Sequence, residues 1–429
     1  LLVVQPVSNG PSEKIGILAG DRIIAVNDSA IAGVKMSTEE IMKRLRGPKG
    51  SKVNLKIVRR GVQDPLVFTV KRDKIPILSL DASYMIQPKT GYIRINRFGA
   101  TTAEEFKKAM KELQKQGMKD MILDLQGNGG GYLNAAIDLA NEFLGQKELI
   151  VYTEGRTAKR SDFYAKGNGE FRNGRLIVLV DEYTASASEI VSGAVQDWDR
   201  GIIVGRRSFG KGLVQRPIDL PDGSMIRLTI ARYYTPAGRC IQKPYDSSTD
   251  YNKDLIERFN HGELMNADSI HFPDSLKVQT KKLGRTVYGG GGIMPDYFVP
   301  IDTTLYTDYH RNLVAKGAVI KFTMKFIEGH RKELANKYKK FESFNEKFII
   351  DDDMLATLRE MGEKEGVKFN EEQYQKSLPL IKTQLKALIA RDLWDMNEYF
   401  RVMNTTNESV QKALEILNSE EYQKKLRAN

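Results

Sequence analysis

Three short stretches of small residues follow apolar runs of the chain and could carry chemistry. They are "LQGNGGG" at 125–131, "TASASEI" at 184–190 and "SFGKG" at 208–212. Glycine-rich turns let backbone N–H groups converge on an anion, and Ser186 stands at the start of a predicted helix, at the positive end of its dipole. These features predict a site that holds a phosphate or stabilises a developing oxyanion.

Lys211 has two chemical interpretations. The spacing Gly205-x4-Gly210-Lys211 is that of a phosphate-binding P-loop, but the next residue is Gly212, where a P-loop needs Ser or Thr to hold Mg²⁺. A lysine can also be the base for a serine nucleophile, provided that burial keeps its amine neutral. A Ser-His-Asp triad is disfavoured, because no G-x-S-x-G elbow occurs. All four histidines also lie outside this region, at His261, His271, His310 and His330.

The same residues have purely structural interpretations. Ser186 and Glu189, three residues apart, form a capping-box pattern that alone explains a serine at a helix start. Lys211 could be a solvated loop residue, and "GNGGG" could be an ordinary tight turn. Spacing alone therefore leaves a catalytic and a structural role open.

Composition limits the class of protein and of partner. The 429 residues are long enough for two or three domains, and 41% hydrophobic with 28% charged residues is typical of a globular protein. The net charge is +11, but basic residues are scattered among acidic ones, so we predict no nucleic-acid partner. Cys240 is the only cysteine, which excludes an intramolecular disulfide and a cysteine-based metal site. We predict neither a metal nor another cofactor.

The periodicity of apolar residues divides the chain into three segments. Residues 1–73 carry short β-branched runs and one helix, typical of a small β domain. Residues 74–303 alternate strands and helices, which predicts an α/β layer with a largely parallel sheet that "MIRLTIARYYTP" closes with a long strand. Within it, the polar stretch 246–288 is predicted to be an inserted surface excursion. Residues 304–429 are predicted to be a helical C-terminal region.

Several motifs together resemble one family. "DLQGNGGG", "TASASEI", "QDWDRGIIVGRRSFGKGLVQ" and "ARYYTPAGRCIQ", in this order, resemble the C-terminal processing peptidases, or tail-specific proteases. "GPSEKIGILAGDRIIAVND" is similar to the signature of the PDZ domain that precedes the protease core in this family. The resemblance covers residues 1 to about 303. It implies a PDZ-like β domain joined to a crotonase-like (ClpP/crotonase) α/β protease core, followed by the helical region.

The resemblance assigns a role to three polar side chains. Ser186 matches the nucleophile, and Lys211, 25 residues later, matches the general base (211 − 186 = 25). Gln215 matches the residue that orients the lysine amine in a Ser-Lys-Gln arrangement. The resemblance thus favours Lys211 as the base for Ser186 over a nucleotide-binding role.

The resemblance also implies an oxyanion hole and two supporting acids. The hole would pair the amide of Ala187 with that of Gly130 or Gly131. Glu189 and Asp197 match acidic positions with a supporting role.

The chain departs from the family pattern in two places. Where the family usually has the motif R-G-N-P-G-G, residues 126–131 of this chain read Q-G-N-G-G-G. Gln126 thus replaces the arginine and Gly129 replaces the proline. The turn and strand that usually begin the PDZ domain are absent before Leu1. Because the chain starts within the strand-like run "LLVVQPV", we expect a piece of a longer protein with an export signal upstream.

The implied function is that of a serine endopeptidase acting on proteins or peptides selected through their free C-termini. An adaptor protein and a homo-oligomer stay open. Such enzymes act mostly outside the bacterial cytoplasm, so a periplasmic or membrane-anchored location is expected. Two alternatives are a catalytically silent PDZ scaffold and a nucleotide-binding protein that uses the P-loop spacing around Lys211.

Overall fold

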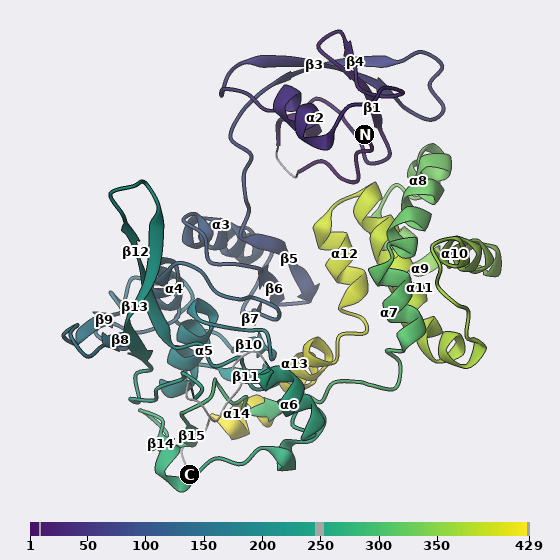
Figure 1. Ribbon diagram of the computed structural model, residues 1–429. Coiled ribbons are helices and arrows are strands. Elements are labelled where there is room, and N and C mark those ends of the chain that lie inside the picture. Colours follow the sequence, from purple (N-terminus) through teal and green to yellow (C-terminus); the bar gives the residue numbers. More distant parts are fainter. Residues whose placement is uncertain (8–9, 245–252, 427–429) are drawn as a thin grey trace. The chain divides into compact units, whose positions relative to one another are not determined.

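Two compact units make up the chain. The computed structural model describes residues 1–7, 10–244 and 253–426. Its contacts group Leu1–Ile77 with Thr303–Met403, and Leu78–Asp302 with Asn404–Asn429 (Figure 1). Each unit therefore combines segments that are far apart in the sequence, whereas the sequence suggested three consecutive segments.

The N-terminal part of the first unit is the expected small β domain. Its sheet has the order β2-β1-β3-β4, and β3 alternates buried and exposed residues, with Val53, Leu55 and Ile57 in the core. The helix α2 begins with a capping box between Ser37 and Glu40, and a short helix α1 was not expected. The elements are α1 (Pro11–Lys14), β1 (Arg22–Val26), β2 (Ser29–Ala30), α2 (Thr38–Leu45), β3 (Lys52–Val58) and β4 (Leu66–Lys71).

The remainder of the first unit is helical, as the sequence predicts. Aromatic rings form much of its core, for example where Phe344 stacks on Phe348 and meets the edge of Trp394. No helix in the described part of the chain is both long and apolar enough to cross a membrane. The helices are α7 (Asp308–Ala315), α8 (Ala318–Lys337), α9 (Phe341–Lys347), α10 (Asp352–Lys364), α11 (Glu371–Leu393) and α12 (Met396–Met403).

The second unit is built on a six-stranded sheet with the order β16-β11-β10-β7-β6-β5. All pairs from β6 to β16 are parallel, and only β5 runs antiparallel. The central strands β7 and β10 are buried along their whole length, as apolar strands of a parallel sheet are. The strands are β5 (Leu80–Gln87), β6 (Thr90–Ile95), β7 (Asp120–Asp124), β10 (Leu176–Val180), β11 (Ile202–Gly205) and β16 (Tyr297–Phe298).

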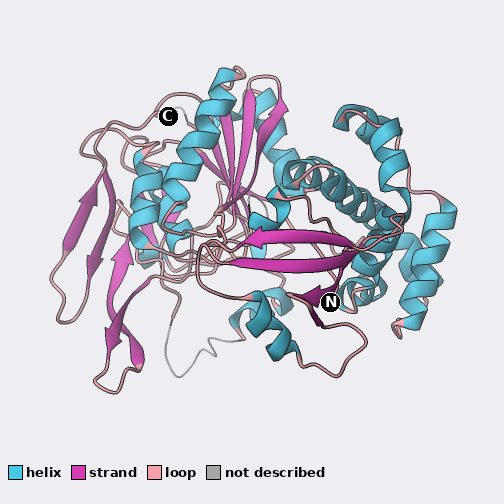
Figure 2. Cartoon of the chain, turned by 90° about the horizontal axis from the view of Figure 1, so that it is seen from above, coloured by secondary structure: helices cyan, strands magenta, loops and turns pink. Residues whose placement is uncertain are grey.

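Helices and a second sheet complete this unit (Figures 1 and 2). The helices α3 (Thr102–Lys115), α4 (Leu133–Asn141) and α5 (Ala187–Asp197) share one apolar core with the parallel strands. The prediction that "MIRLTIARYYTP" closes the parallel sheet is wrong. It forms β13 (Met225–Tyr234), which pairs with β12 (Leu213–Asp219) and β8 (Leu149–Glu154) in an antiparallel sheet β12-β13-β8-β9. The fourth strand, β9, spans Ser161–Tyr164.

The polar stretch 246–288 contains regular elements in its described part. Its beginning, within residues 245–252, lies outside the described residues. The rest contains a helix and a hairpin, which its polar composition did not indicate: α6 (Asp254–Asn260), β14 (Lys277–Gln279) and β15 (Thr286–Tyr288). The buried Arg258 donates to Glu263 within the stretch and to the carbonyl of Arg207 at 2.7 Å each, and the second bond holds the stretch to the loop after β11.

The end of the chain returns to the second unit. Its two helices are α13 (Glu408–Asn418) and α14 (Glu421–Lys425). The amide of Leu176 donates to the hydroxyl of Tyr422 at 2.9 Å, and Arg175 donates to the carbonyl of Leu417 at 2.6 Å. These helices therefore belong with the α/β core, although the sequence suggested one continuous helical region.

Candidate active site

The loops that carry the predicted site follow neighbouring parallel strands. The glycine turn follows β7, Ser186 follows β10, and the loop with Lys211 follows β11. Because β10 lies between β7 and β11, the three loops leave the same edge of the sheet with the serine in the middle. Sites of α/β sheets are built at this edge.

Ser186 has an unusual backbone at the start of α5. It is the residue before the helix, with φ +57° and ψ −114°, a conformation that non-glycine residues rarely adopt. Such strain costs about 1–3 kcal/mol and is found at functional sites. Its side chain is half-buried at the positive end of the helix dipole.

The buried carboxylate of Glu189 connects Ser186 to the lysine loop. One oxygen accepts from the amides of Ser186 at 2.7 Å and Lys211 at 2.9 Å. The other accepts from the hydroxyl of Ser208 at 2.5 Å and the amide of Gly210 at 2.7 Å. Burial raises the pKa of Glu189, and these four donors oppose that shift. One side chain therefore fixes the backbones of both the serine and the lysine.

Lys211 and Gln215 line one open cavity of about 1000 Å³. Lys211 is half-buried, and its carbonyl accepts from the hydroxyl of Tyr233. Gln215 is exposed on β12, the edge strand of the antiparallel sheet. Among the described residues, no hydrogen bond joins the Ser186 hydroxyl to the Lys211 amine, so the structure brings these residues together through backbone contacts only.

The glycine turn lies directly against the serine. A Cβ on Gly130 would come within 2.7 Å of the Ser186 Cβ and 2.8 Å of the Ala187 nitrogen, and the φ of Gly130 is +92°. A Cβ on Gly131 would lie 2.0 Å from the Phe98 carbonyl oxygen. Glycine is therefore required at both positions for the turn to approach so closely.

The amide positions favour one of the two predicted oxyanion-hole pairs. The Gly130 amide donates to the Asn128 side chain at 2.9 Å. In contrast, neither the Gly131 amide nor the Ala187 amide donates to another described residue. Ala187 with Gly131 is therefore the pair whose amides have no acceptor within the described part of the chain.

Asp197 is separated from this group. It is the last residue of α5, about 17 Å along the helix from Ser186 at 1.5 Å per residue. It is fully buried, forms an ion pair with Arg239 and accepts from the amide of Ala237 at 2.8 Å. These contacts fold the chain after β13 onto α5.

Sequence reasoning missed two residues of the site. Ser208 donates to Glu189 and accepts from the amide of Ile293 at 2.6 Å, which joins the lysine loop to a distant segment. Asn128 accepts from Gly130 and donates to the carbonyl of Ile95 at 2.8 Å, and so fixes the glycine turn. Both stand inside the quoted motifs, where a polar residue among glycines was the available signal.

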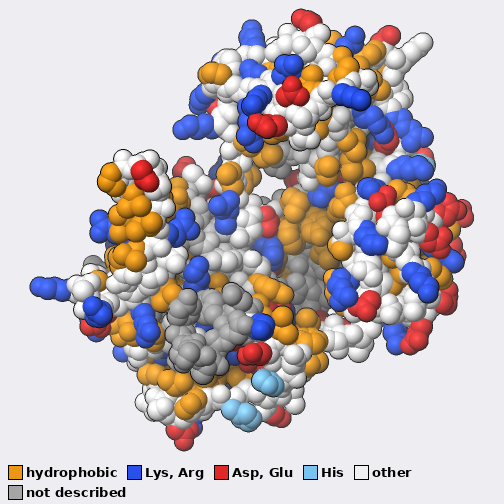
Figure 3. Space-filling view, in the orientation of Figure 1, with side chains coloured by type: hydrophobic (Ala, Val, Ile, Leu, Met, Phe, Trp, Pro, Cys, Tyr) orange, Lys and Arg blue, Asp and Glu red, His pale blue; other side chains and the backbone are white. Residues whose placement is uncertain are grey.

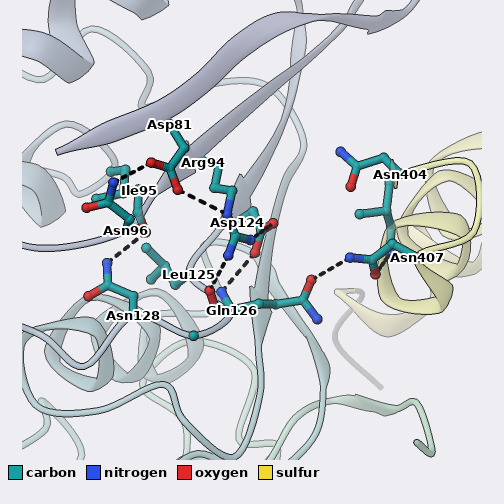
Figure 4. A network of polar contacts seen from close by, with 12 residues as sticks. Asp81, Arg94, Ile95, Asn96, Asp124, Leu125, Gln126, Asn128, Asn404 and Asn407 are labelled. Carbon is teal, nitrogen blue, oxygen red and sulfur yellow. Dashed lines mark hydrogen bonds and ion pairs between the residues drawn. The ribbon is translucent and has the colours of Figure 1, made fainter. Parts of the chain in front are cut away.

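A polar network around Arg94 also supports the glycine turn (Figure 4). The carbonyl of Gln126, where the family motif has arginine, accepts from Arg94 at 2.8 Å. Arg94 also pairs with Asp124 and Asp81. The guanidinium group of Arg94 thus reaches the turn from β6.

Over residues 1–7, 10–244 and 253–426, no group of three or more His, Cys, Asp or Glu side chains could hold a metal ion.

Known families match most of these parts of the chain. The model of peptidase family S41 matches residues 89–249, the PDZ domain model matches residues 2–59, and a family of unknown function matches residues 309–395. The chain is thus a PDZ domain combined with an α/β peptidase core and a helical region, which confirms the predicted fold class.

Curated relatives give the same family. The carboxyl-terminal-processing protease of Synechocystis is 40% identical over 248 residues, which are 57% of each chain. The carboxy-terminal processing protease CtpB of Bacillus subtilis is 34% identical over 245 residues, 57% of this chain and 50% of that one. A probable CtpA-like serine protease of Staphylococcus aureus is 30% identical over 367 residues, 83% of this chain and 69% of that one.

The chain belongs to peptidase family S41, among the carboxyl-terminal processing proteases, which confirms the predicted resemblance. It spans only half to three fifths of the length of the Synechocystis and Bacillus relatives.

Proposed function

We propose that the chain is a serine endopeptidase in which Ser186 is the nucleophile and Lys211 the general base. The observation that carries this proposal is the buried Glu189 carboxylate, which accepts from the amides of both residues in a chain of the S41 family. A structural capping role for Ser186 alone does not require the same carboxylate to hold the lysine loop.

The residues support a two-step acyl transfer. The Ser186 hydroxyl attacks the carbonyl carbon of the scissile bond while the Lys211 amine takes its proton. The amides of Ala187 and Gly131 stabilise the resulting oxyanion, helped by the positive end of α5. The C–N bond breaks when Lys211 returns the proton to the leaving amine, and water, deprotonated by Lys211, hydrolyses the acyl-enzyme. Gln215 orients the lysine amine in this scheme.

An extended polypeptide is the substrate that the surroundings of Lys211 favour. β12 is an edge strand, so its outer backbone groups can pair with an added strand. The β12–β13 hairpin also exposes apolar side chains (Figure 3), among them Met225, Ile226 and Leu228, and such patches mark interaction sites. The PDZ domain would select substrates by their free C-termini, at a location outside the cytoplasm.

Tail selection can be tested on its own. Two peptides of identical sequence, one ending in a free carboxylate and the other amidated, would be compared as substrates of the chain. We expect a higher kcat/KM for the acid, since each charge-assisted hydrogen bond to the carboxylate is worth about 1.5–3 kcal/mol. Equal values would mean that the PDZ domain does not read the terminus.

Variants at Lys211 test the catalytic assignment. With an internally quenched peptide, Lys211→Ala, Lys211→Arg and Ser186→Ala should each lose at least about 1000-fold in kcat. Arginine keeps the charge but cannot give up a proton near neutrality. Lys119→Arg, at an exposed position away from the site, is the matched control and should retain activity.

Two results would contradict the proposal. If Lys211→Arg kept most of the activity, Lys211 would not be the base. If the unchanged chain cleaved no peptide and its Ser186 did not react with a fluorophosphonate probe, while the peptides still bound, the scaffold alternative would hold.

A further inference from the structure

We infer that Asn407 and Gln126 are positioning residues, through which the C-terminal segment 404–426 holds the glycine turn in place. This inference rests on the proposed function of that turn as part of the oxyanion hole. Gln126 is the first residue of the turn after β7, and Asn407 precedes α13. The Asn407 side-chain nitrogen donates to the Gln126 side-chain oxygen at 3.0 Å, as Figure 4 shows.

The C-terminal segment is firmly docked near the site. The Asn404 side chain donates to the buried Tyr84 hydroxyl at 2.8 Å, and Gln411 donates to the Asn404 carbonyl at 2.6 Å. α13 packs on β10 and β11, the strands that lead to Ser186 and to the lysine loop. Its buried residues include Val410 and Ile416. The segment therefore provides a fixed support for a contact to the turn.

One side chain has two roles at this contact. The Asn407 oxygen accepts from the amide of Val410 at 3.2 Å and so caps α13, while its nitrogen donates to Gln126. The cap of α13 therefore fixes the orientation of the Asn407 side-chain amide that donates to the turn. Since capping needs only the oxygen, the nitrogen is the part of the side chain that acts on the turn.

The contact continues to the oxyanion hole through a short run of anchored residues. The Gly127 amide donates to Asp181 at 3.0 Å, Asn128 bonds to Ile95 and to Gly130, and Gly130 lies against Ser186. Gln126 is the residue of this run that the C-terminal segment contacts. A loosened Gln126 would let the turn shift, and an oxyanion donor that moves away from its place loses most of its effect.

Charge substitutions can separate this role from capping. Gln126→Glu alone can still accept from Asn407. Asn407→Asp alone still caps α13, and the Gln126 amide can rotate to donate to the introduced carboxylate. Only the double variant places two acceptors against each other. We therefore expect each single variant to keep kcat within about threefold, and the double variant to lose about tenfold in kcat with little change in KM.

The pH profile and hydrogen exchange provide independent measurements. Protonation of one of the two carboxyl groups restores a donor, so the kcat of the double variant relative to the unchanged chain should recover as the pH falls toward 4–5, about the ordinary range of carboxyl pKa values. Amide exchange in peptides covering residues 126–132 should speed up in the double variant only, whereas exchange across 408–418 should stay unchanged.

The outcomes are distinguishable. A double variant with unchanged kcat overturns the inference. So does a loss of kcat together with faster exchange across 408–418, because the contact would then only hold α13. If the unchanged chain has no peptidase activity, the proposed function fails, and the exchange of residues 126–132 alone decides whether Asn407 anchors the turn.

Discussion

Replacing Glu189 with glutamine tests whether one carboxylate holds the serine and the lysine loop together. The substitution keeps the size of the side chain and removes its charge and one acceptor. In the native site each carboxylate oxygen accepts two hydrogen bonds, from Ser186 and Lys211 on one side and from Ser208 and Gly210 on the other. A glutamine must turn its NH₂ group toward one of these pairs.

The geometry allows the cost to be worked out. The NH₂ group is expected to face Ser208 and Gly210, because the Ser208 hydroxyl can rotate and accept, whereas the other two donors are backbone amides. The Gly210 amide then lacks an acceptor, which costs about 1–3 kcal/mol. The bonds from Ser186 and Lys211 lose their charge assistance, on the order of 1 kcal/mol each. The neutral side chain is easier to bury, which offsets part of this loss.

We therefore expect the free energy of unfolding of the second unit to fall by about 2–4 kcal/mol, out of the 5–15 kcal/mol typical of a domain. The unit should still fold. We expect kcat to fall at least about 100-fold, because the bonds that hold Ser186 and Lys211 to their shared acceptor are weakened and the Gly210 amide beside Lys211 loses its acceptor.

Urea unfolding followed by tryptophan fluorescence measures this effect. The chain has two tryptophans, and in a Trp394→Phe background Trp198, at the end of α5, reports on the second unit alone. Glu142→Gln is the matched control. Glu142 is also buried in the second unit and accepts from the amide of Glu170 at 3.0 Å. Its replacement by glutamine should therefore lower the free energy of unfolding without changing kcat. A loss below about 1 kcal/mol for Glu189→Gln, with kcat within threefold, would refute the reasoning.

Two further predictions concern other parts of the chain. Gly130→Ala should lower both stability, by about 2–4 kcal/mol, and kcat, by more than about 100-fold, because the new Cβ meets Ser186 at 2.7 Å and the backbone has a positive φ. Gly129→Ala, whose Cβ would meet nothing within 4 Å, should be tolerated, and equal kinetics of the two variants would exclude the proposed hole. In α12, burial and a hydrogen bond with Asp395 raise the pKa of Glu398 from 4.5 to about 7. The stability that this group contributes is fully present below about pH 4.5 and is lost as the pH rises through about 7. The Tm of the first unit should therefore fall over this range. The same fall of Tm with pH in Glu398→Gln would contradict the assignment.

Much of the candidate site could be predicted from short motifs, because the local backbone conformation of its residues depends on their neighbours in the sequence. A serine before a helix and a glycine turn after a strand are encoded within a few residues. The structure accordingly brings Gly130, Ala187 and Glu189 together around Ser186. The residues that hold the turn in place could not be predicted from the sequence. Arg94 and Asn407 lie 32 and 281 residues from Gln126 and reach it only through the tertiary fold.

The fold shows the same limit. Period and composition suffice to predict the α/β alternation and the helical region, since these depend on neighbours in the sequence. Strand pairing depends on partners far along the chain, so β13 was assigned to the wrong sheet. Likewise, no local pattern separates α13 from the helices before it, because its place is set by contacts with β10 and β11.

The order of the strands explains how three weak motifs come together at the proposed catalytic site. Ser186 leaves the central strand of the three, the glycine turn leaves β7 on one side, and Lys211 follows β11 on the other. Attack on a carbonyl needs this separation, because the base must lie at the serine proton while the amides face the oxygen on which charge develops. A base and a glycine turn on the same side would compete for one position. In the proposed mechanism the sheet would therefore keep proton transfer and charge stabilisation apart, while Glu189, which follows the serine in α5, accepts from the amides of both Ser186 and Lys211.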